Sequence, residues 1–200
     1  NNTLTGRSAA RGEGLVKSKV KVVAVSDRKV PVSSSVVRGP NGTPSPPSCE
    51  NLEIDEWYRR CLTDIKKASE VELASYIYDN PGVHKLLLQR LRGGAAFKLD
   101  LYIDAEKFSE DWPRYQKPRV RELQQAGASI YVCKGPKAQG AYHCKALVAD
   151  RRYLYTGNAN FTYKSSSNEE LVFRMTGPVV QQVLEKLFVH RQSGKVWTGV

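Results

Sequence analysis

The apolar positions of the chain predict alternating helices and strands from residue 52 onward. Spacing near 3.6 residues, which marks one face of a helix, first appears in Leu52, Ile54, Trp57, Tyr58, Cys61, Leu62 and Ile65. Further helices are expected at residues 83–91, 119–125 and 178–190. Short β-rich runs predict strands at residues 71–78, 97–104, 128–133, 143–149, 152–156 and 169–173. This alternation predicts an α/β fold with a mixed, mainly parallel sheet flanked by helices.

The first 48 residues have a different composition. They are rich in Ser, Gly, Val and basic residues, and they end in the Pro- and Gly-rich run RGPNGTPSPPS, which can hold neither a helix nor a strand. We therefore expect a disordered basic tail over residues 1–48 and one folded domain over residues 49–200. Within the tail the net charge is +6, out of +11 for the whole chain.

Both the tail and the folded domain carry a net positive charge, which favours polyanionic partners. Nucleic acid and an anionic lipid surface both fit such a field, and a soluble basic protein without either partner is the alternative. Four cysteines occur without a CxxC pair and without histidines at zinc-finger spacing, so reduced structural thiols are expected and no metal site.

The stretch from Tyr142 to Asn160, YHCKALVADRRYLYTGNAN, combines a buried-strand pattern with polar residues at its start. Because residues i and i+2 of a strand project to the same face, His143 and Lys145 share one side. A tight turn at Asp150 then sends the chain back, so that Asn160 ends near the level of His143. The sequence thus predicts that an imidazole, an ammonium and a carboxamide converge.

These three groups suit a phosphodiester. Lys145 and Asn160 can neutralise and hydrogen-bond the non-bridging oxygens while a neutral imidazole attacks phosphorus, a scheme that needs no metal or other cofactor. The nitrogen of the same imidazole that does not attack carries the N–H, and this N–H must be held by an acceptor. Glu169 is the candidate acceptor, and the adjacent Glu170 is the alternative. His84 and His190 fall on helical patterns and are expected to be solvated.

The spacing H-x-K-x4-D-x6-G-x-x-N resembles the signature of the phospholipase D superfamily, HxKxxxxD followed by GS or GG, any residue, and Asn. The matching residues are His143, Lys145, Asp150, Gly157 and Asn160, and Glu169 matches the downstream carboxylate of the family. One position departs from the signature, since Asn158 stands where the family has Ser or Gly. The resemblance implies a phospholipase D-like fold over residues 52–200.

The resemblance also implies a two-step reaction through a phosphohistidine, with a second histidine protonating the leaving group. Family members with two motifs supply both histidines from one chain, whereas this chain has one motif. A homodimer in which the two His143 side chains face each other is therefore expected. Asp150 is expected to orient or support the site. Gly157, Asn158 and the loop lysines Lys134 and Lys137 are the candidate substrate-binding residues, although a solvated loop accounts equally well for the lysines.

Three functions remain open at this stage. The first is a nuclease that acts on DNA or RNA, the second a phospholipid hydrolase of the cardiolipin type, and the third a nucleic-acid-binding module without turnover. Aromatic residues beside the motif either stack on bases or belong to the core: Tyr142, Tyr155, Phe161 and Tyr163. An intracellular location is expected, because no apolar run is long enough to span a membrane and a secretory route could glycosylate Asn160.

Overall fold

The computed structural model describes residues 46–94, 96–110, 114–137 and 140–199. Within these ranges one sheet of eight strands has the order β1-β7-β6-β5-β2-β3-β4-β8. The strands are β1 (Ser48–Leu52), β2 (Glu70–Ser75), β3 (Lys98–Asp104), β4 (Ser129–Cys133), β5 (Lys145–Ala149), β6 (Tyr153–Gly157), β7 (Val172–Thr176) and β8 (Lys195–Val196). The helices are α1 (Ile54–Lys67), α2 (Pro81–Arg92), α3 (Ala105–Ser109), α4 (Gln116–Gln125) and α5 (Pro178–Ser193), with a 3-10 helix at Lys164–Ser167.

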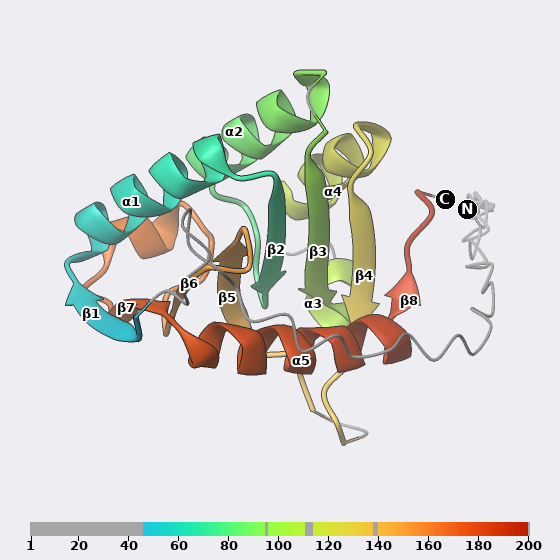
Figure 1. Ribbon diagram of the computed structural model, residues 1–200. Coiled ribbons are helices and arrows are strands. Elements are labelled where there is room, and N and C mark those ends of the chain that lie inside the picture. The colour runs from blue at the N-terminus through green and yellow to red at the C-terminus, as the bar shows by residue number, and fades with distance from the viewer. Residues whose placement is uncertain (1–45, 95, 111–113, 138–139, 200) are drawn as a thin grey trace, which may run out of the picture.

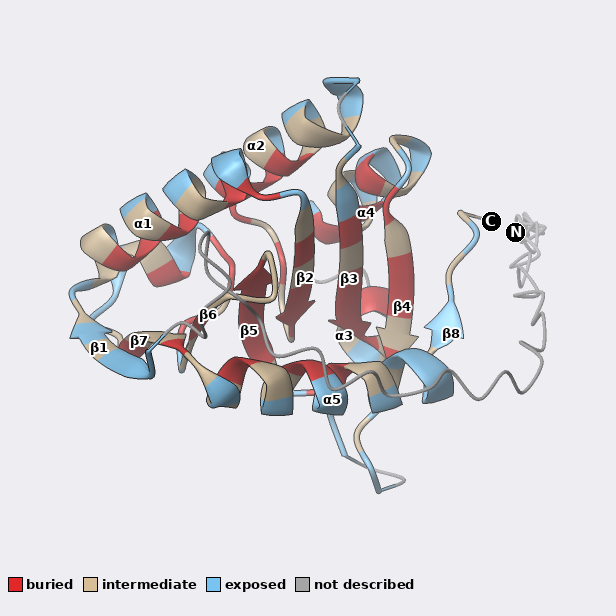
Figure 2. Cartoon of the chain, in the orientation of Figure 1, coloured by how far each residue is buried: buried red, intermediate tan, exposed pale blue. Residues whose placement is uncertain are grey.

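Helices cover both faces of this sheet. Figure 1 shows α1, α2 and α4 on one face and α5 across the other. Strand residues alternate accordingly, with Leu73 in the cluster under α1, α2 and α4 and Ala74 in the cluster under α5. Figure 2 shows burial along the central strands and the inward sides of the helices. The predicted α/β class with a mixed, helix-flanked sheet is confirmed.

The expectation of a mainly parallel sheet needs correction. Parallel pairing joins β2 to β3 and β3 to β4, where a helix connects each strand to the next. The remaining pairings between described strands are antiparallel. One of these pairings follows from the short connection between β5 and β6, since a chain that turns back within a few residues can only form an antiparallel pair. Three residues separate the two strands; Asp150 and Arg151 have φ values of 49° and 54°, and Arg152 N donates to Ala149 O at 3.0 Å.

The described chain begins just before an edge strand that the sequence did not predict. β1 pairs antiparallel with β7. Its Glu50 carboxylate accepts hydrogen bonds from Arg60 Nη1 at 2.7 Å and Arg174 Nη1 at 3.3 Å. This strand starts at the boundary proposed between tail and domain, while residues 1–45, on which the tail prediction rests, lie outside the described residues.

The cysteines are free thiols, as expected: Cys49, Cys61, Cys133 and Cys144. Cys61 and Cys133 are buried in the core. Burial raises the pKa of the Cys133 thiol to about 12, and it raises that of Cys61 as well. Both side chains are therefore protonated, unreactive core residues at neutral pH.

Candidate active site

The candidate site forms where β5 begins, beside the ends of β2 and β6. Ser75, the last residue of β2, pairs with Lys145, the first residue of β5. Beyond β2, Tyr78 forms a parallel bridge with Phe161, which follows β6. The continuation of β2 thus lies between the two segments that carry the motif residues. The predicted strand at residues 71–78 ends early because these last residues leave the sheet to support the site.

His143 and Lys145 meet as their spacing predicted. The Lys145 Nζ lies 3.0 Å from Nδ1 and 3.2 Å from Nε2 of the His143 imidazole. Lys145 is buried, with 8% of its surface exposed, whereas His143 is exposed and precedes the strand. The ammonium is therefore fixed below an imidazole that remains open to a substrate.

The protonation of this pair favours a nucleophilic imidazole. Burial lowers the pKa of His143 below its usual 6.5, and the charge of Lys145 lowers it further, while Asp104 acts in the opposite direction. Burial also lowers the pKa of Lys145, against the opposing effects of Cys144 and Glu170. At neutral pH the imidazole is consequently uncharged, with a nitrogen lone pair available for attack.

Asn160 is held firmly, yet its side-chain oxygen has no partner. The Tyr58 hydroxyl donates to the Asn160 backbone carbonyl at 3.0 Å, and the backbone N–H groups of Asp79 and Asn80 donate to Phe161 O at 3.0 and 2.9 Å. Asn160 Oδ1 is buried and accepts no hydrogen bond from the described residues. Buried polar atoms are rarely left unpaired, and among the motif residues Asn160 is the one with such an atom.

Gly157 and Asn158 shape the turn that leads to Asn160. Gly157 has a φ of 151°, and a Cβ at this position would lie 2.2 Å from Leu171 O, so only glycine fits. The Asn158 side chain accepts a hydrogen bond from Leu171 N at 2.8 Å, and its own N–H donates to Leu171 O at 3.1 Å. Asn158 therefore extends the β6–β7 pairing, which is a structural use for the one residue that departs from the signature.

Asp150, which is expected to orient or support the site, lies away from His143 and Lys145, so the structure does not place it with the catalytic residues. It follows Ala149 at the far end of β5, five residues beyond Lys145. Its Oδ1 accepts hydrogen bonds from Ser69 N at 2.7 Å, Ser69 Oγ at 2.8 Å and Glu70 N at 3.2 Å. The carboxylate thus joins the β5–β6 turn to the start of β2, which is a structural role.

The two adjacent carboxylates before β7 lie differently. Glu169 is exposed, and Glu170 is half-buried. Glu170 accepts a hydrogen bond from Asn168 Nδ2 at 3.1 Å, and its charge raises the pKa of Lys145. Neither residue lies in the strand, which begins only at Val172. Of these two carboxylates, Glu170 is the one whose charge acts on Lys145.

Lys134 and Lys137 lie on the loop that follows β4 and ends at His143. Both are exposed. The loop projects past α5 in Figure 1 and is closed on itself by hydrogen bonds from Gly135 N to Gly140 O and from Gly140 N to Lys137 O, each 2.9 Å. Both lysines are thus solvent-exposed on this loop, and no contact among the described residues joins either of them to His143 or Lys145.

Tyr76 is a site residue that the sequence analysis missed. Its ring centroid lies 4.5 Å from that of His143, with the planes tilted by 53°, and 5.5 Å from the Lys145 Nζ. It falls within residues 71–78, which the sequence predicts as a strand without singling out this side chain. No local pattern marks Tyr76, because its place beside His143 follows from the pairing of β2 with β5, in which the preceding residue Ser75 lies opposite Lys145.

The prediction that His84 and His190 are solvated is wrong. His84 is buried, and its Nε2 lies 2.9 Å from Glu122 Oε2. His190 is half-buried, with its ring 4.9 Å from that of Tyr142. Burial lowers the pKa of both residues. Both lie on the inward sides of their helices, a position that the spacing of the helical stripe could have indicated.

The aromatic residues beside the motif divide into two groups. Tyr142, Tyr155 and Phe161 are buried core residues. Tyr163 is 67% exposed on the segment that follows Asn160. Of the four, only Tyr163 therefore presents a ring to which a base could stack.

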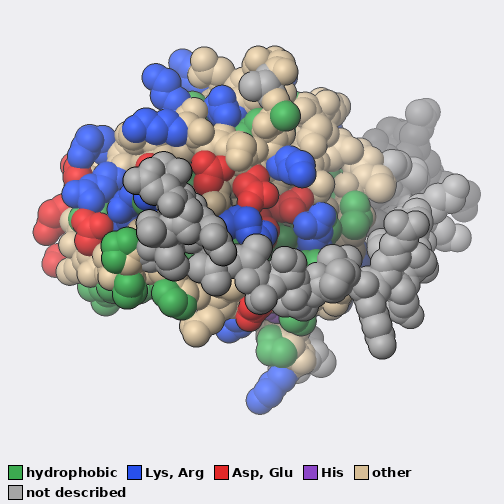
Figure 3. Space-filling model, in the orientation of Figure 1, with side chains coloured by type: hydrophobic (Ala, Val, Ile, Leu, Met, Phe, Trp, Pro, Cys, Tyr) green, Lys and Arg blue, Asp and Glu red, His purple; other side chains and the backbone are tan. Residues whose placement is uncertain are grey.

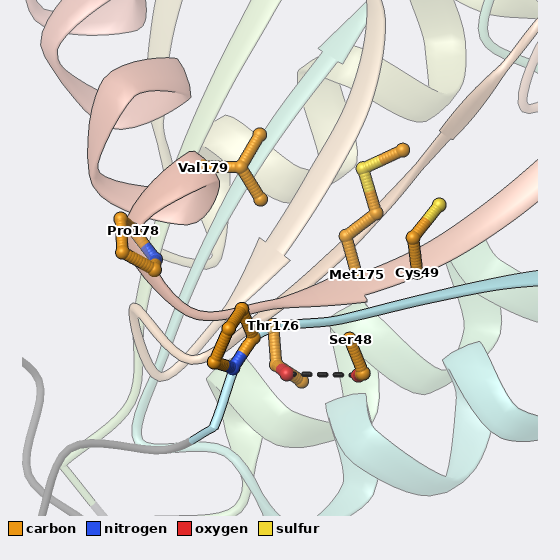
Figure 4. A pocket seen from close by; sticks show the side chains of 7 residues that line it. Ser48, Cys49, Met175, Thr176, Pro178 and Val179 are labelled. Carbon is orange, nitrogen blue, oxygen red and sulfur yellow. Dashed lines mark hydrogen bonds between the residues drawn. The ribbon is translucent and has the colours of Figure 1, made fainter.

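A pocket of about 420 Å³ lies away from these residues, between the end of β7 and the start of α5. Figure 4 shows Ser48 and Thr176 hydrogen-bonded beside it, at 2.9 Å. Thr176 is at the opposite end of β7 from Val172, which pairs with Gly157. The pocket is therefore separate from the candidate active site.

Two searches of the described residues were negative. No group of three or more His, Cys, Asp or Glu side chains in this part of the chain is placed to hold a metal ion. No helix in it has the length and apolar character needed to cross a membrane.

A sequence profile of the family described as "Cardiolipin synthase, PLD-like domain" matches residues 61–192. The chain belongs to the phospholipase D superfamily. The matched region includes all the motif residues from His143 to Glu169. Comparison with curated protein sequences finds no match.

Solved structures of the phospholipase D family share the fold. Nuc from Salmonella typhimurium, a phospholipase D family member, aligns with a TM-score of 0.64 and 17% identity, over 76% of this chain and 99% of its own. NucT from Helicobacter pylori aligns with a TM-score of 0.64 and 15% identity, over 76% and 100%. Phosphatidylserine synthase from Haemophilus influenzae Rd KW20 aligns with a TM-score of 0.61 and 13% identity, over 78% and 41%.

Proposed function

We propose that this phospholipase D superfamily protein is a metal-independent phosphodiesterase that hydrolyses DNA or RNA. The observation that carries the proposal is the contact of 3.0 Å between Lys145 Nζ and His143 Nδ1. A phosphodiester placed over this pair would meet a nucleophile and a cation together. Asn160, whose Oδ1 is unpaired, follows β6 and carries an amide group that can donate to a phosphate oxygen.

The proposed reaction has two steps. An imidazole nitrogen of His143 attacks phosphorus and the P–O bond to the leaving group breaks, while a second, protonated imidazole gives its proton to the leaving oxygen. Water then attacks the phosphohistidine and passes a proton to the second imidazole, and the P–N bond breaks. Lys145 stabilises the charge that develops on the non-bridging oxygens in both steps.

Charge and an exposed ring favour nucleic acid as the substrate. The chain carries a net charge of +11, and Lys and Arg side chains gather over α1 and α2 on the face shown in Figure 3. Tyr163, close to Asn160 in the chain, exposes most of its ring. A polyanion with stacking bases complements both features.

A phospholipid is the second candidate substrate. The description of the matching family profile names cardiolipin synthase, and a phosphatidylserine synthase is among the structural neighbours. The same imidazole and ammonium would act on a head-group phosphodiester, since the reacting atoms are the same.

We expect the purified protein to cleave single- or double-stranded DNA or RNA in the presence of EDTA. The measurement is gel analysis of labelled oligonucleotides, with cardiolipin vesicles as a parallel substrate. Hydrolysis of the lipid without cleavage of any oligonucleotide would assign the second candidate. Salt-sensitive binding of nucleic acid without cleavage of either substrate would indicate a binding module. Loss of cleavage on chelation would overturn the metal-independent scheme.

We further propose that two copies of the chain complete one site, because the two-step scheme needs a second imidazole. Of the other histidines, His84 pairs with Glu122 and His190 packs on Tyr142, so neither is placed to protonate a leaving group at His143. The second imidazole is then the His143 of a symmetric partner.

The dimer proposal predicts that cleavage follows the dimer population on dilution. Sedimentation analysis and activity assays over the same concentration range provide the measurement. The specific activity should fall in parallel with the fraction of dimer, and the pH profile should be bell-shaped because the two imidazoles need opposite protonation states. A monomer with full specific activity would contradict the proposal.

A further inference from the structure

A buried carboxylate lies directly behind the segment that carries His143. Asp104 is the last residue of β3, and only 1% of its surface is exposed. Its Oδ2 accepts a hydrogen bond of 2.6 Å from the backbone N–H of Tyr142. A buried charge is costly unless several donors satisfy it, so this carboxylate is expected to have a defined task.

The second oxygen of Asp104 has a separate task. Its Oδ1 accepts hydrogen bonds from Glu106 N at 3.0 Å and Lys107 N at 2.9 Å, which makes Asp104 the N-cap of α3. One rigid side chain therefore ties the backbone just before His143 to the junction of β3 and α3. This contact joins residues 38 positions apart in the chain.

We propose that Asp104 is a positioning residue for His143: it fixes the backbone at Tyr142 and thereby sets the direction in which the His143 imidazole faces the substrate. The inference rests on the proposed function, in which His143 is the nucleophile. Tyr142 is also packed against the His190 ring on α5, so the Asp104 hydrogen bond fixes a residue whose side chain is already confined. The next residue, His143, is exposed and depends on that support.

The charge of Asp104 gives the positioning a measurable signature. The charged and titratable groups that act on His143 are Lys145 from β5, Tyr76 from the continuation of β2 and Asp104 from β3. Lys145 lowers the pKa of His143, whereas Asp104 raises it. Removing the Asp104 charge should consequently move the titration of His143 to lower pH.

Asp150 provides a matched control within the same chain. Asp150 directly follows the last residue of β5, much as Asp104 is the last residue of β3. Each carboxylate accepts three hydrogen bonds, which for Asp150 come from Ser69 and Glu70. Asp150 lies at the other end of β5 from Lys145. Asp150→Asn removes the same charge as Asp104→Asn, and asparagine tolerates the positive φ of this turn.

The test compares Asp104→Asn with Asp150→Asn. In Asp104→Asn the remaining oxygen can still cap α3, but the amide places a donor against the Tyr142 N–H. We expect kcat to fall by about 10- to 100-fold with little change in KM, as for a misplaced reacting group. The acid limb of the kcat/KM profile should move to lower pH. Asp150→Asn should lower the unfolding temperature and leave the pH profile in place.

A second measurement separates this inference from the proposed function. NMR titration of the His143 ring requires no turnover, so a shift to lower pH in Asp104→Asn alone supports the inference even if the wild-type protein cleaves none of the substrates. Should Asp104→Asn fail to fold, Asp104→Ser retains a cap for α3 and is measured in its place. An unchanged His143 titration together with unchanged kcat in the folded variant would overturn the proposal.

Discussion

Replacing His143 by alanine is expected to lower phosphodiester cleavage by about 10⁴-fold or more, because the proposed mechanism has no other nucleophile. The expected effect on folding is small. His143 is exposed and precedes β5, so its removal should change the free energy of unfolding by no more than about 0.5 kcal/mol. Single-turnover cleavage of a labelled oligonucleotide and urea unfolding of the same preparation measure the two effects.

Cys144→Ser is the matched control for that variant. It changes the residue between His143 and Lys145 and removes no group used in the reaction, so cleavage should stay near the wild-type rate. A His143→Ala protein that retains cleavage at a rate close to the control would rule out the imidazole as nucleophile. If both variants lose activity while both remain folded, cleavage depends on the conformation of the segment at residues 143–145 and not on the imidazole itself.

The helices and central strands follow directly from local sequence patterns, whereas the sheet edge does not. Trp57, Cys61 and Ile65 recur at helical spacing, and all three are buried in α1. By contrast, β1 has the sequence SCENL, which lacks the alternation of a half-buried strand. Its Glu50 binds Arg174 of β7, 124 positions away in the chain, and Arg60 of the neighbouring α1. Tertiary contacts of this kind leave no local pattern to read.

The candidate site shows the same division. His143 and Lys145 meet although β5 begins only at Lys145, so the predicted strand over residues 143–149 starts two residues late while the two side chains still come together. Asp150 belongs to the same sequence motif, yet it lies at the other end of β5 and accepts a hydrogen bond from Ser69 there. Asp104 lies outside the motif and reaches it only through the fold. Spacing therefore identifies groups that act through local geometry, while supporting residues depend on which strand ends the sheet places together.

Gly157→Ala is expected to destabilise the fold by about 3 kcal/mol or more, because backbone strain and a steric clash add together. The glycine has a φ of 151°, and the new Cβ would lie 2.2 Å from Leu171 O and 2.8 Å from Val172 Cα, so β6 and β7 must separate. Gly127→Ala is the control: its φ is 105°, but nothing lies within 4 Å of the added Cβ, and about 1 kcal/mol is expected there. Urea unfolding midpoints measure both. Equal losses in the two variants would show that the close approach of Leu171 to Gly157 is not what restricts this position to glycine.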